Sequence, residues 1–400
     1  MCKITKENDS LQRQTENKDE NSQYLLKDVL NKIIDFRGKT PLKLGMKWGG
    51  NIPALSAMNV KDGIIKFNED THYGSIELYE KWMTKGDCTK GDIVLTMEAP
   101  MGNVAQIPNN QKYILSQRVI LLKFNEKLVS NEYMYQYLRS PYFKKQMNRY
   151  ATGTTAKGIK QKNLIKIRLK IPSLLEQKFI GTFLSAIDKK IGFMEKKHTL
   201  YQNIKKYYSH VLFSNTSDWN KKNLKDIAII KIGFTPSTKK EEYWNGNIKW
   251  LAVSDMGSKY ISKTKKHITK IAIGKKEIIK KDTLVMSFKL TIGKLGILKE
   301  DMYSNEAICN FQWKNKNINT EFMYYYLSSI NLKKYGSQAA KGITLNKETL
   351  NMIPIRIPSY ETQINIVNIL SNIDIKLEYL SKKINYEKRY KKGLLQKMFV

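Results

Sequence analysis

Short runs of apolar residues, separated by turn residues, fill the chain from residue 24 to 172 and again from 215 to 358. The clearest are Ile93 to Met97, Tyr113 to Phe124, Ile165 to Ile171, Thr283 to Phe288 and Met352 to Ile357. Because these runs are rich in β-branched and aromatic residues, they predict strands. A helix is expected between the strands at Asn131 to Met147, and at Thr320 to Tyr335 in the second half. Each half is therefore predicted to be an α+β module.

A different pattern follows each module. Apolar positions spaced three and four residues apart run from Ile180 to Leu212 and from Ile366 to Met398, with polar breaks such as His198 and Lys391. This heptad pattern predicts two helices that pair as an antiparallel coiled coil. A helix of about 38 residues would be about 57 Å long at 1.5 Å per residue. The predicted seam consists of Ile180, Phe183, Ile187, Ile191, Met194, Ile366, Ile369, Ile373, Leu377 and Leu380.

Each long helix has a start signal. The modules end at Pro172 and Pro358, and Ser173 with Glu176 three residues later forms a capping-box signature. The second copy has Thr362 at the place of Glu176, which predicts a weaker cap.

The two halves repeat one another. Ile171-Pro-Ser-Leu-Leu-Glu-Gln177 returns as Ile357-Pro-Ser-Tyr-Glu-Thr-Gln363, an offset of 186 residues that holds without gaps to Phe213 and Phe399. Upstream, the match continues with small insertions, as expected for different loops on one framework. The predicted fold class is α+β, with two similar modules separated by an antiparallel coiled coil of two long helices, in pseudo-twofold symmetry. The predicted domains are a polar, disordered arm (1–23), the first module (24–172), the first long helix (173–214), the second module (215–358) and the second long helix (359–400).

The charge points to a polyanionic partner. The 70 Lys and Arg residues against 36 Asp and Glu give a net charge of +34. A lysine-rich composition from an AT-rich genome explains part of it, but such a bias enriches glutamate as well. Basic side chains neutralise phosphates and release counterions, so nucleic acid is the favoured partner. An acidic membrane surface is the competing partner, and the spread of the charge along the whole chain argues against it.

Several other chemistries are disfavoured. No run of about eighteen apolar residues and no signal peptide is present, so we expect a cytoplasmic protein that does not bind membranes. Cys2, Cys88 and Cys309 lack metal-site spacing and are expected to be buried free thiols, and no metal or cofactor is expected. Gly38-Lys-Thr resembles the end of a phosphate-binding loop, but Ile33 stands where that loop needs glycine.

The repeated helix segment resembles a known family. Ile171 to Lys190 and Ile357 to Lys376 each carry a proline-ended strand, then glutamine, then Leu-Ser-x-Ile-Asp, and each helix closes with Lys-Lys before Phe213 or Phe399. This doubled pattern resembles the specificity subunits of type I restriction-modification systems. The resemblance implies a non-catalytic, DNA-binding subunit with two target recognition domains, each reading half of a bipartite site. It also implies two adenine methyltransferase (modification) subunits, which use S-adenosylmethionine, and two ATP-dependent restriction subunits as partners.

Residues that read DNA are sought among polar turn positions that differ between the copies. Lys or Arg suits guanine and Asn or Gln suits adenine, whereas most basic side chains contact phosphates. The candidates in the first module are Arg37, Lys39, Lys43, Lys47, Ser116, Gln117, Arg118, Thr154, Thr155, Lys157 and Lys160. Those in the second are Thr235, Ser237, Lys239, Lys240, Lys289, Thr291, Lys294, Lys341 and Thr344. For any one of them a solvated surface charge is the simpler interpretation, and Arg118 equally suits a structural ion pair.

Two other functions remain open. A nucleic-acid-modifying enzyme would need a catalytic half, for which two copies of one module leave no room. A coiled-coil scaffold outside restriction-modification would account for the helices, but it would leave the charge and the paired modules without a role.

Overall fold

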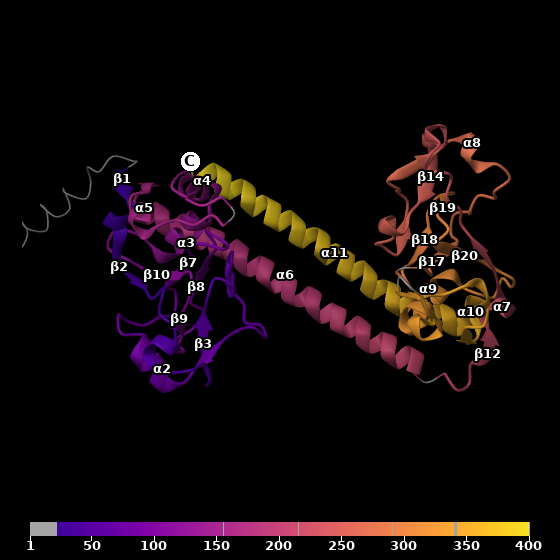
Figure 1. Cartoon of the computed structure of the whole chain (residues 1–400), viewed down its shortest axis with the longest axis horizontal. Helices are drawn as coiled ribbons and strands as arrows, with labels where there is room; N and C mark the ends of the chain where they lie inside the picture. The colour runs from indigo at the N-terminus through magenta and orange to yellow at the C-terminus, as the bar shows by residue number, and fades with distance from the viewer. Residues whose placement is uncertain (1–21, 155, 215, 290, 340–341, 400) are drawn as a thin grey trace, which may run out of the picture. The chain divides into compact units, whose positions relative to one another are not determined.

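The computed structural model describes residues 22–154, 156–214, 216–289, 291–339 and 342–399 (Figure 1). Residues 1–21 of the predicted arm (1–23) lie outside the described residues, whereas residues 22 and 23 belong to a strand, which corrects the predicted boundary. The chain divides into two compact units: unit 1 comprises residues 1–195 and 382–400, and unit 2 comprises residues 196–381. Each unit therefore contains one module, the first half of the long helix that follows it, and the second half of the other long helix.

The module of unit 1 is organised around a four-stranded antiparallel sheet in the order β2-β10-β7-β8. These strands are β2 (Leu30–Asp35), β7 (Ile93–Thr96), β8 (Val104–Gln106) and β10 (Val119–Phe124). The smaller pieces are β1 (Ser22–Leu25) on β11 (Arg168–Ile171), the hairpin of β4 (Val60–Lys61) and β5 (Ile64–Ile65), and the sheet of β3 (Ile52–Leu55), β6 (Tyr73–Gly74) and β9 (Ile114–Leu115). The helices are α2 (Ile76–Trp82), α3 (Asn131–Arg139), α4 (Pro141–Arg149) and α5 (Gln161–Leu164).

The helix predicted at Asn131 to Met147 is two helices, which corrects the prediction. Ser140 is in an extended conformation between α3 and α4, and its hydroxyl accepts a hydrogen bond from the Phe143 amide. Pro141 follows at the first position of α4, where it has no amide proton to continue α3. The strand predicted at Tyr113 to Phe124 is likewise divided into β9 and β10, because the backbone turns at Arg118 with a φ of 67°.

Unit 2 repeats this framework with an additional strand. Its main sheet has the order β13-β20-β17-β18-β15, formed by β13 (Ala228–Ile232), β15 (Tyr260–Ile261), β17 (Leu284–Ser287), β18 (Leu295–Leu298) and β20 (Ile308–Trp313). The other strands are β12 (Asn220–Asn223) on β23 (Pro354–Ile357), β14 (Trp244–Leu251) with β16 (Lys266–Ile268) and β19 (Tyr303–Ser304), and the hairpin of β21 (Ser337–Ala339) and β22 (Gly342–Thr344). The helices are α7 (Leu224–Ile227), α8 (Lys270–Ile273), α9 (Thr320–Ser329) and α10 (Lys347–Asn351). The helix predicted at Thr320 to Tyr335 ends at Ser329, and a separate turn of 3-10 helix covers Leu332–Tyr335.

The two long helices are α6 (Leu174–Ser214) and α11 (Tyr360–Met398). In unit 1, Asp188 pairs with Lys391 and Lys190 with Glu387. One partner's number rises as the other's falls, so the two segments run antiparallel. In unit 2, Lys205 pairs with Asp374 and His198 contacts Ser381, with the same direction.

Burial along these helices follows the predicted seam with one difference. Ile187, Ile191, Met194, Ile366, Ile373 and Leu380 are buried, and Ile180 and Leu377 are partly exposed. Phe183 and Ile369, however, are each 39% exposed, and the adjacent Leu184 and Leu370 are fully buried instead. The first turns of each helix pack on their own module, so Leu184 and Leu370 join the module cores there.

The close contact between module and helix in unit 1 depends on a glycine. A Cβ atom on Gly181 would lie 2.7 Å from the Tyr133 amide nitrogen of α3. In unit 2 the equivalent residue is Val367, which is 9% exposed.

Two of the thiols are buried as predicted. Cys88 and Cys309 are free and buried, and burial raises the pKa of each to about 12. Cys2 lies outside the described residues. Among the described helices, none has the length and apolar character needed to cross a bilayer.

Candidate nucleic-acid interface

Strand register gathers the variable loops of unit 1 at one edge of its main sheet. Val119, at the start of β10, lies opposite Thr96 at the end of β7, and Ile120 lies opposite Asp35 at the end of β2. The loops after β2, between β7 and β8, and before β10 therefore leave the sheet at the same edge. We call these three loops, with the adjoining turn at residues 152–160, the loop edge of unit 1.

Hydrogen bonds hold the parts of this loop edge together. The Met97 amide donates to the Arg118 carbonyl at 2.8 Å, and the Ile159 amide donates to the Met97 carbonyl at 3.0 Å. Arg118 also pairs with Glu98, with Nε to Oε1 at 3.4 Å, and both side chains are about half exposed. The candidates near residue 117 and those near residue 157 therefore lie together, around Glu98.

The individual candidates of unit 1 differ in availability. Lys39 donates to the Lys81 and Trp82 carbonyls, and burial together with Lys85 lowers its pKa. Arg37 forms an ion pair with Asp35 at 2.6 Å, and Lys43 donates to the Gly38 carbonyl. These two charged groups therefore stabilise the loop that follows β2. Ser116 is buried. The exposed candidates are Lys47, Gln117, Arg118, Thr154, Lys157 and Lys160, and Thr155 lies outside the described residues.

Unit 2 forms an equivalent loop edge. Ile232 at the end of β13 lies opposite Cys309, and Ser287 at the end of β17 lies opposite Ile308. The loops at 233–240, 288–294 and 305–307 therefore emerge together. The Leu345 amide donates to the Phe288 carbonyl at 3.0 Å, which brings the end of the β21-β22 hairpin to the same edge.

Most candidates of unit 2 lie on this edge. Lys289 extends over the Phe288 ring, and Thr344 directly precedes Leu345. Lys294 donates to the Val253 carbonyl at 3.4 Å, and Lys240 contacts the Tyr243 hydroxyl at 3.3 Å. The remaining described candidates, Thr235, Ser237, Lys239 and Thr291, are exposed, and Lys341 lies outside the described residues.

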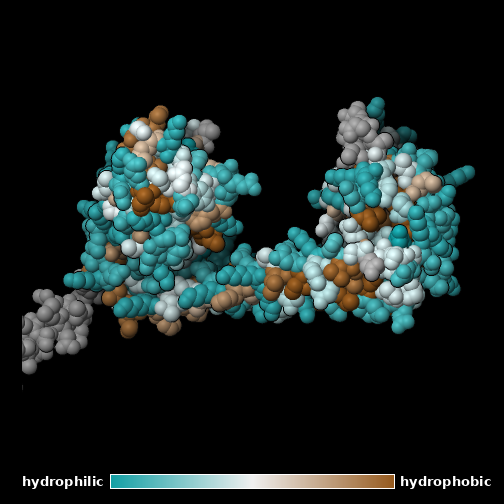
Figure 2. Space-filling model, turned by 90° about the horizontal axis from the view of Figure 1, so that it is seen from below, coloured by the Kyte–Doolittle hydropathy of each residue, from teal (hydrophilic) through white to brown (hydrophobic). Residues whose placement is uncertain are grey.

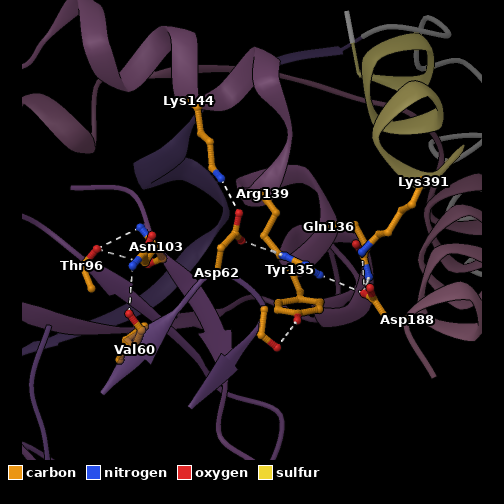
Figure 3. A network of polar contacts seen from close by, with 11 residues as sticks. Val60, Asp62, Thr96, Asn103, Tyr135, Gln136, Arg139, Lys144, Asp188 and Lys391 are labelled. Atoms are coloured by element: carbon orange, nitrogen blue, oxygen red, sulfur yellow. Dashed lines mark hydrogen bonds and ion pairs between the residues drawn. The ribbon is translucent and has the colours of Figure 1, made fainter. Parts of the chain in front are cut away.

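The sequence did not predict a polar network beside the loop edge of unit 1 (Figure 3). Asp188 of α6 accepts hydrogen bonds from Gln136 at 2.9 Å, Arg139 at 2.9 Å and Lys391 of α11 at 2.6 Å. Arg139 and Lys144 also pair with Asp62 of the turn between β4 and β5. The network thus connects a module hairpin, α3, α4 and both long helices.

The charges of this network are strongly coupled. Burial alone would raise the pKa of Asp188, but Arg139 and Lys391 lower it below its usual value. Burial, with the nearby Arg139 charge, lowers the pKa of Lys391 to about 8. The repeated Ile-Asp dipeptide was the available sequence signal, whereas Lys391 appeared only as a polar break in a heptad pattern.

Unit 2 has a related network around Asp374, the equivalent of Asp188. Asp374 accepts from Lys205 at 2.5 Å and from the Tyr325 hydroxyl at 2.7 Å. Lys259, which directly precedes β15, pairs with Glu321 of α9 at 2.8 Å.

In each network, the carboxylates are engaged by cations from neighbouring elements. Within the described ranges, His, Cys, Asp and Glu side chains form no group of three or more suited to a metal ion.

Two α+β modules, each followed by a long helix that pairs with the other, define a class of duplicated proteins that includes solved S subunits. The structure of the type I restriction-modification S subunit from M. genitalium is similar with a TM-score of 0.63, at 15% identity over 96% of this chain and 97% of that one. A second structure, described as showing complex assembly and conformational transition of the type I R-M system, gives a TM-score of 0.56 at 14% identity. The predicted α+β fold class is confirmed.

The family model for the type I restriction modification DNA specificity domain matches residues 18–201 and 216–387. The chain therefore belongs to this family. It is 24% identical to the MjaVIII specificity subunit of Methanocaldococcus jannaschii over 91% of this chain and 90% of the relative. With the MjaIX specificity subunit of the same organism it shares 32% identity over 40% of this chain, and that match spans only 39% of the relative. The prediction of a non-catalytic specificity subunit is confirmed.

Proposed function

We propose that this specificity subunit is the DNA-binding part of a type I restriction-modification complex, and that each module reads one half of a bipartite site. The observation that carries the proposal is the loop edge present in both units. A duplicated sheet supports loops whose polar residues differ between the copies. Since base contacts specify and phosphate contacts only position, two different sets of loop residues suit two different half-sites.

The exposed loop residues are assigned to the bases. Gln117 offers an amide that pairs with adenine, and Lys47 and Lys157 offer ammonium groups for guanine. In unit 2, Lys239 and Lys289 have the same role. Arg37, Lys39 and Lys43 are assigned to holding the first loop, because their charged groups are already engaged within the module.

The long helices are assigned to docking and spacing. Both carry large apolar side chains that are exposed: Leu175 (80%), Phe179 (71%) and Phe193 (70%) on α6, with Ile375 (62%) and Tyr379 (60%) on α11. In Figure 2 most of the visible surface is hydrophilic, and hydrophobic patches interrupt it along the helical segment. Exposed apolar patches mark protein interfaces. We assign them to two adenine methyltransferase subunits and the ATP-dependent restriction subunits, and the length of the helix pair to setting the distance between half-sites.

The proposal is tested by sequencing methylated adenines in a host that expresses the partner subunits, with and without this chain. A two-part, asymmetric methylated motif is expected only when the chain is present. A methylome that is the same in both hosts would contradict the proposal. The purified chain alone is expected neither to methylate nor to cleave DNA, since its partners supply that chemistry.

A further inference from the structure

A cavity of about 1030 Å³ lies within unit 1, outside the loop edge. Its walls are the hairpin of β4 and β5, helices α3 and α4, and the segments of α6 and α11 that belong to this unit. Eight of its lining side chains are basic and three are acidic. The cavity therefore has a strong excess of positive charge.

The three acidic groups are already engaged by bases within the cavity. Asp62 pairs with Lys144 and Arg139, and Asp188 pairs with Arg139 and Lys391 (Figure 3). Glu195 pairs with Lys388 at 2.7 Å. By contrast, Lys61, Lys66, Lys145 and Lys392 are exposed and form no ion pair within the described residues. The uncompensated charge is thus on flexible ammonium groups that can reach an incoming anion, whereas the paired acids and bases of the cavity are held in place by one another.

The duplication supplies an internal comparison. Unit 2 has a cavity of about 1020 Å³ at equivalent positions, and its lining contains no acid and two lysines, Lys205 and Lys206. Gln202 stands in place of Lys388, Ser209 in place of Leu395, and Ser328 in place of Arg139. One framework therefore forms a strongly basic cavity in one unit and a mostly neutral polar cavity in the other, so the framework does not require the charge.

The basic cavity adjoins the loop edge. The Gly63 amide donates to the Val104 carbonyl at 2.7 Å, and the Asn103 side-chain amide donates to the Val60 carbonyl at 3.0 Å. Asn103 in turn donates from its backbone to the Thr96 hydroxyl (Figure 3). The hairpin that lines the cavity is therefore attached directly to the strands from which the loop edge emerges.

We propose that the basic cavity of unit 1 binds a phosphate group, and that this phosphate belongs to the backbone of the DNA duplex read by the same unit. This inference rests on the proposed function. Lysine ammonium groups bind phosphates as point charges and carry no sequence information, so the cavity adds affinity without selecting bases. Because only two lysines line the equivalent cavity of unit 2, the phosphate contact strengthens binding on one side of the bipartite site.

The test uses the complex of the full chain with its methyltransferase subunits and a duplex that carries the methylated motif. In the triple variant Lys61→Gln, Lys145→Gln and Lys392→Gln, affinity at low salt should fall about 10-fold or more, equally for cognate and non-cognate duplexes. The slope of log K against log salt should become shallower by about 0.9 for each phosphate that the variant no longer neutralises. The methylated motif of the variant should remain the same as that of the wild type. Unchanged affinity in the variant would overturn only the phosphate site. Absence of a methylated motif with the wild-type chain would instead overturn the proposed function.

A charge-matched control is available in unit 2. The triple variant Lys206→Gln, Lys333→Gln and Lys334→Gln removes three lysine charges from unit 2, of which only Lys206 lines the equivalent cavity, and should have a clearly smaller effect. Equal weakening of DNA affinity by both triple variants would show that only net charge matters and would overturn the proposal.

Titration with ATP tests whether the cavity binds a free nucleotide. Tight nucleotide binding to unit 1 that DNA does not displace would assign the cavity to a free nucleotide, and failure of the variant to bind methyltransferase subunits would assign it to a partner protein; either result would contradict the DNA backbone as the source.

Discussion

Lys391 of α11 donates to Asp188 of α6 at 2.6 Å, across 203 residues of sequence. The same pair occurs in unit 2, where Lys205 lies 2.5 Å from Asp374. The 186-residue offset converts one pair into the other, with Asp188 equivalent to Asp374 and Lys205 equivalent to Lys391. In each unit the acid belongs to the helix that follows that unit's module, and the base comes from the other helix. The pair thus fixes the register of the two helices within each unit.

Removing the acid of this pair should destabilise unit 1. In Asp188→Asn, Arg139 and Lys391 lose their shared carboxylate and remain close to one another with like charge. We expect the free energy of unfolding of unit 1 to fall by about 2–4 kcal/mol. This loss is near or below the range for breaking a fully buried ion pair, because the carboxylate is partly exposed. Denaturant unfolding of the full chain measures this loss. The double variant Asp188→Asn/Lys391→Met should recover part of it, and a double variant no more stable than the single one would contradict the account.

Lys391 should also make the stability of unit 1 depend on pH. Its pKa is lowered by burial from 10.5 to about 8 in the folded chain. Between these two values the unfolded chain binds the proton more tightly, so the contribution of Lys391 to the free energy of unfolding rises with pH and is constant below pH 8. Relative to Lys391→Met, the wild type should therefore gain stability from pH 7.5 to pH 10. Parallel pH profiles for the two proteins would show that the folded-state pKa is not lowered.

The glutamine of the repeated motif should be a structural residue. Gln363 is buried, accepts from the Asn319 amide at 2.9 Å, and donates to the Asn317 and Pro358 carbonyls. Gln363→Leu leaves these groups without partners, so we expect unit 2 to lose about 2–4 kcal/mol. The exposed neighbour variant Asn365→Ala should change the free energy of unfolding by less than about 0.5 kcal/mol. Equal effects of the two variants in thermal or denaturant unfolding would refute this role.

Single loop residues should affect one half-site at a time. Gln117→Ala in unit 1 should relax the preference at one position of one half of the methylated motif by about 1–3 kcal/mol of discrimination. Lys289→Ala should act only on the other half. Sequencing of methylated adenines with each variant reports both effects. A variant that weakens methylation uniformly, with both halves intact, would assign its residue to the phosphate backbone.

The sequence predicted the duplicated architecture well, because its signals are local. The heptad pattern and the Ser173 capping box indicated a long helix, and Ser173 does contact Glu176. The break at Ser140 was missed because α3 and α4 are both amphipathic, so the periodicity continues across it. The charged network was missed for a different reason. Asp188 and Lys391 acquire their roles only when distant segments pack together, and no spacing rule relates residues so far apart.

The loop residues were predicted as a group, and the structure separates them. Turn position and difference between copies selected several loops, and strand register brings most of these loops to one edge of each main sheet. No sequence pattern indicates, however, that Lys39 donates to the carbonyls of the last two residues of α2, or that Ser116 is buried. Whether a lysine faces solvent depends on carbonyl groups that only the folded loop presents.

The central claim, that each module reads its own half-site, is tested most directly by a chain with two identical modules. Residues 215–358 are replaced by a second copy of residues 24–172, both long helices are kept, and methylated adenines are sequenced in a host that expresses the partner subunits. The expected result is a new motif composed of two copies of one wild-type half-site, with the other half-site absent. Retention of the original asymmetric motif by this chain would show that the modules do not each read their own half-site.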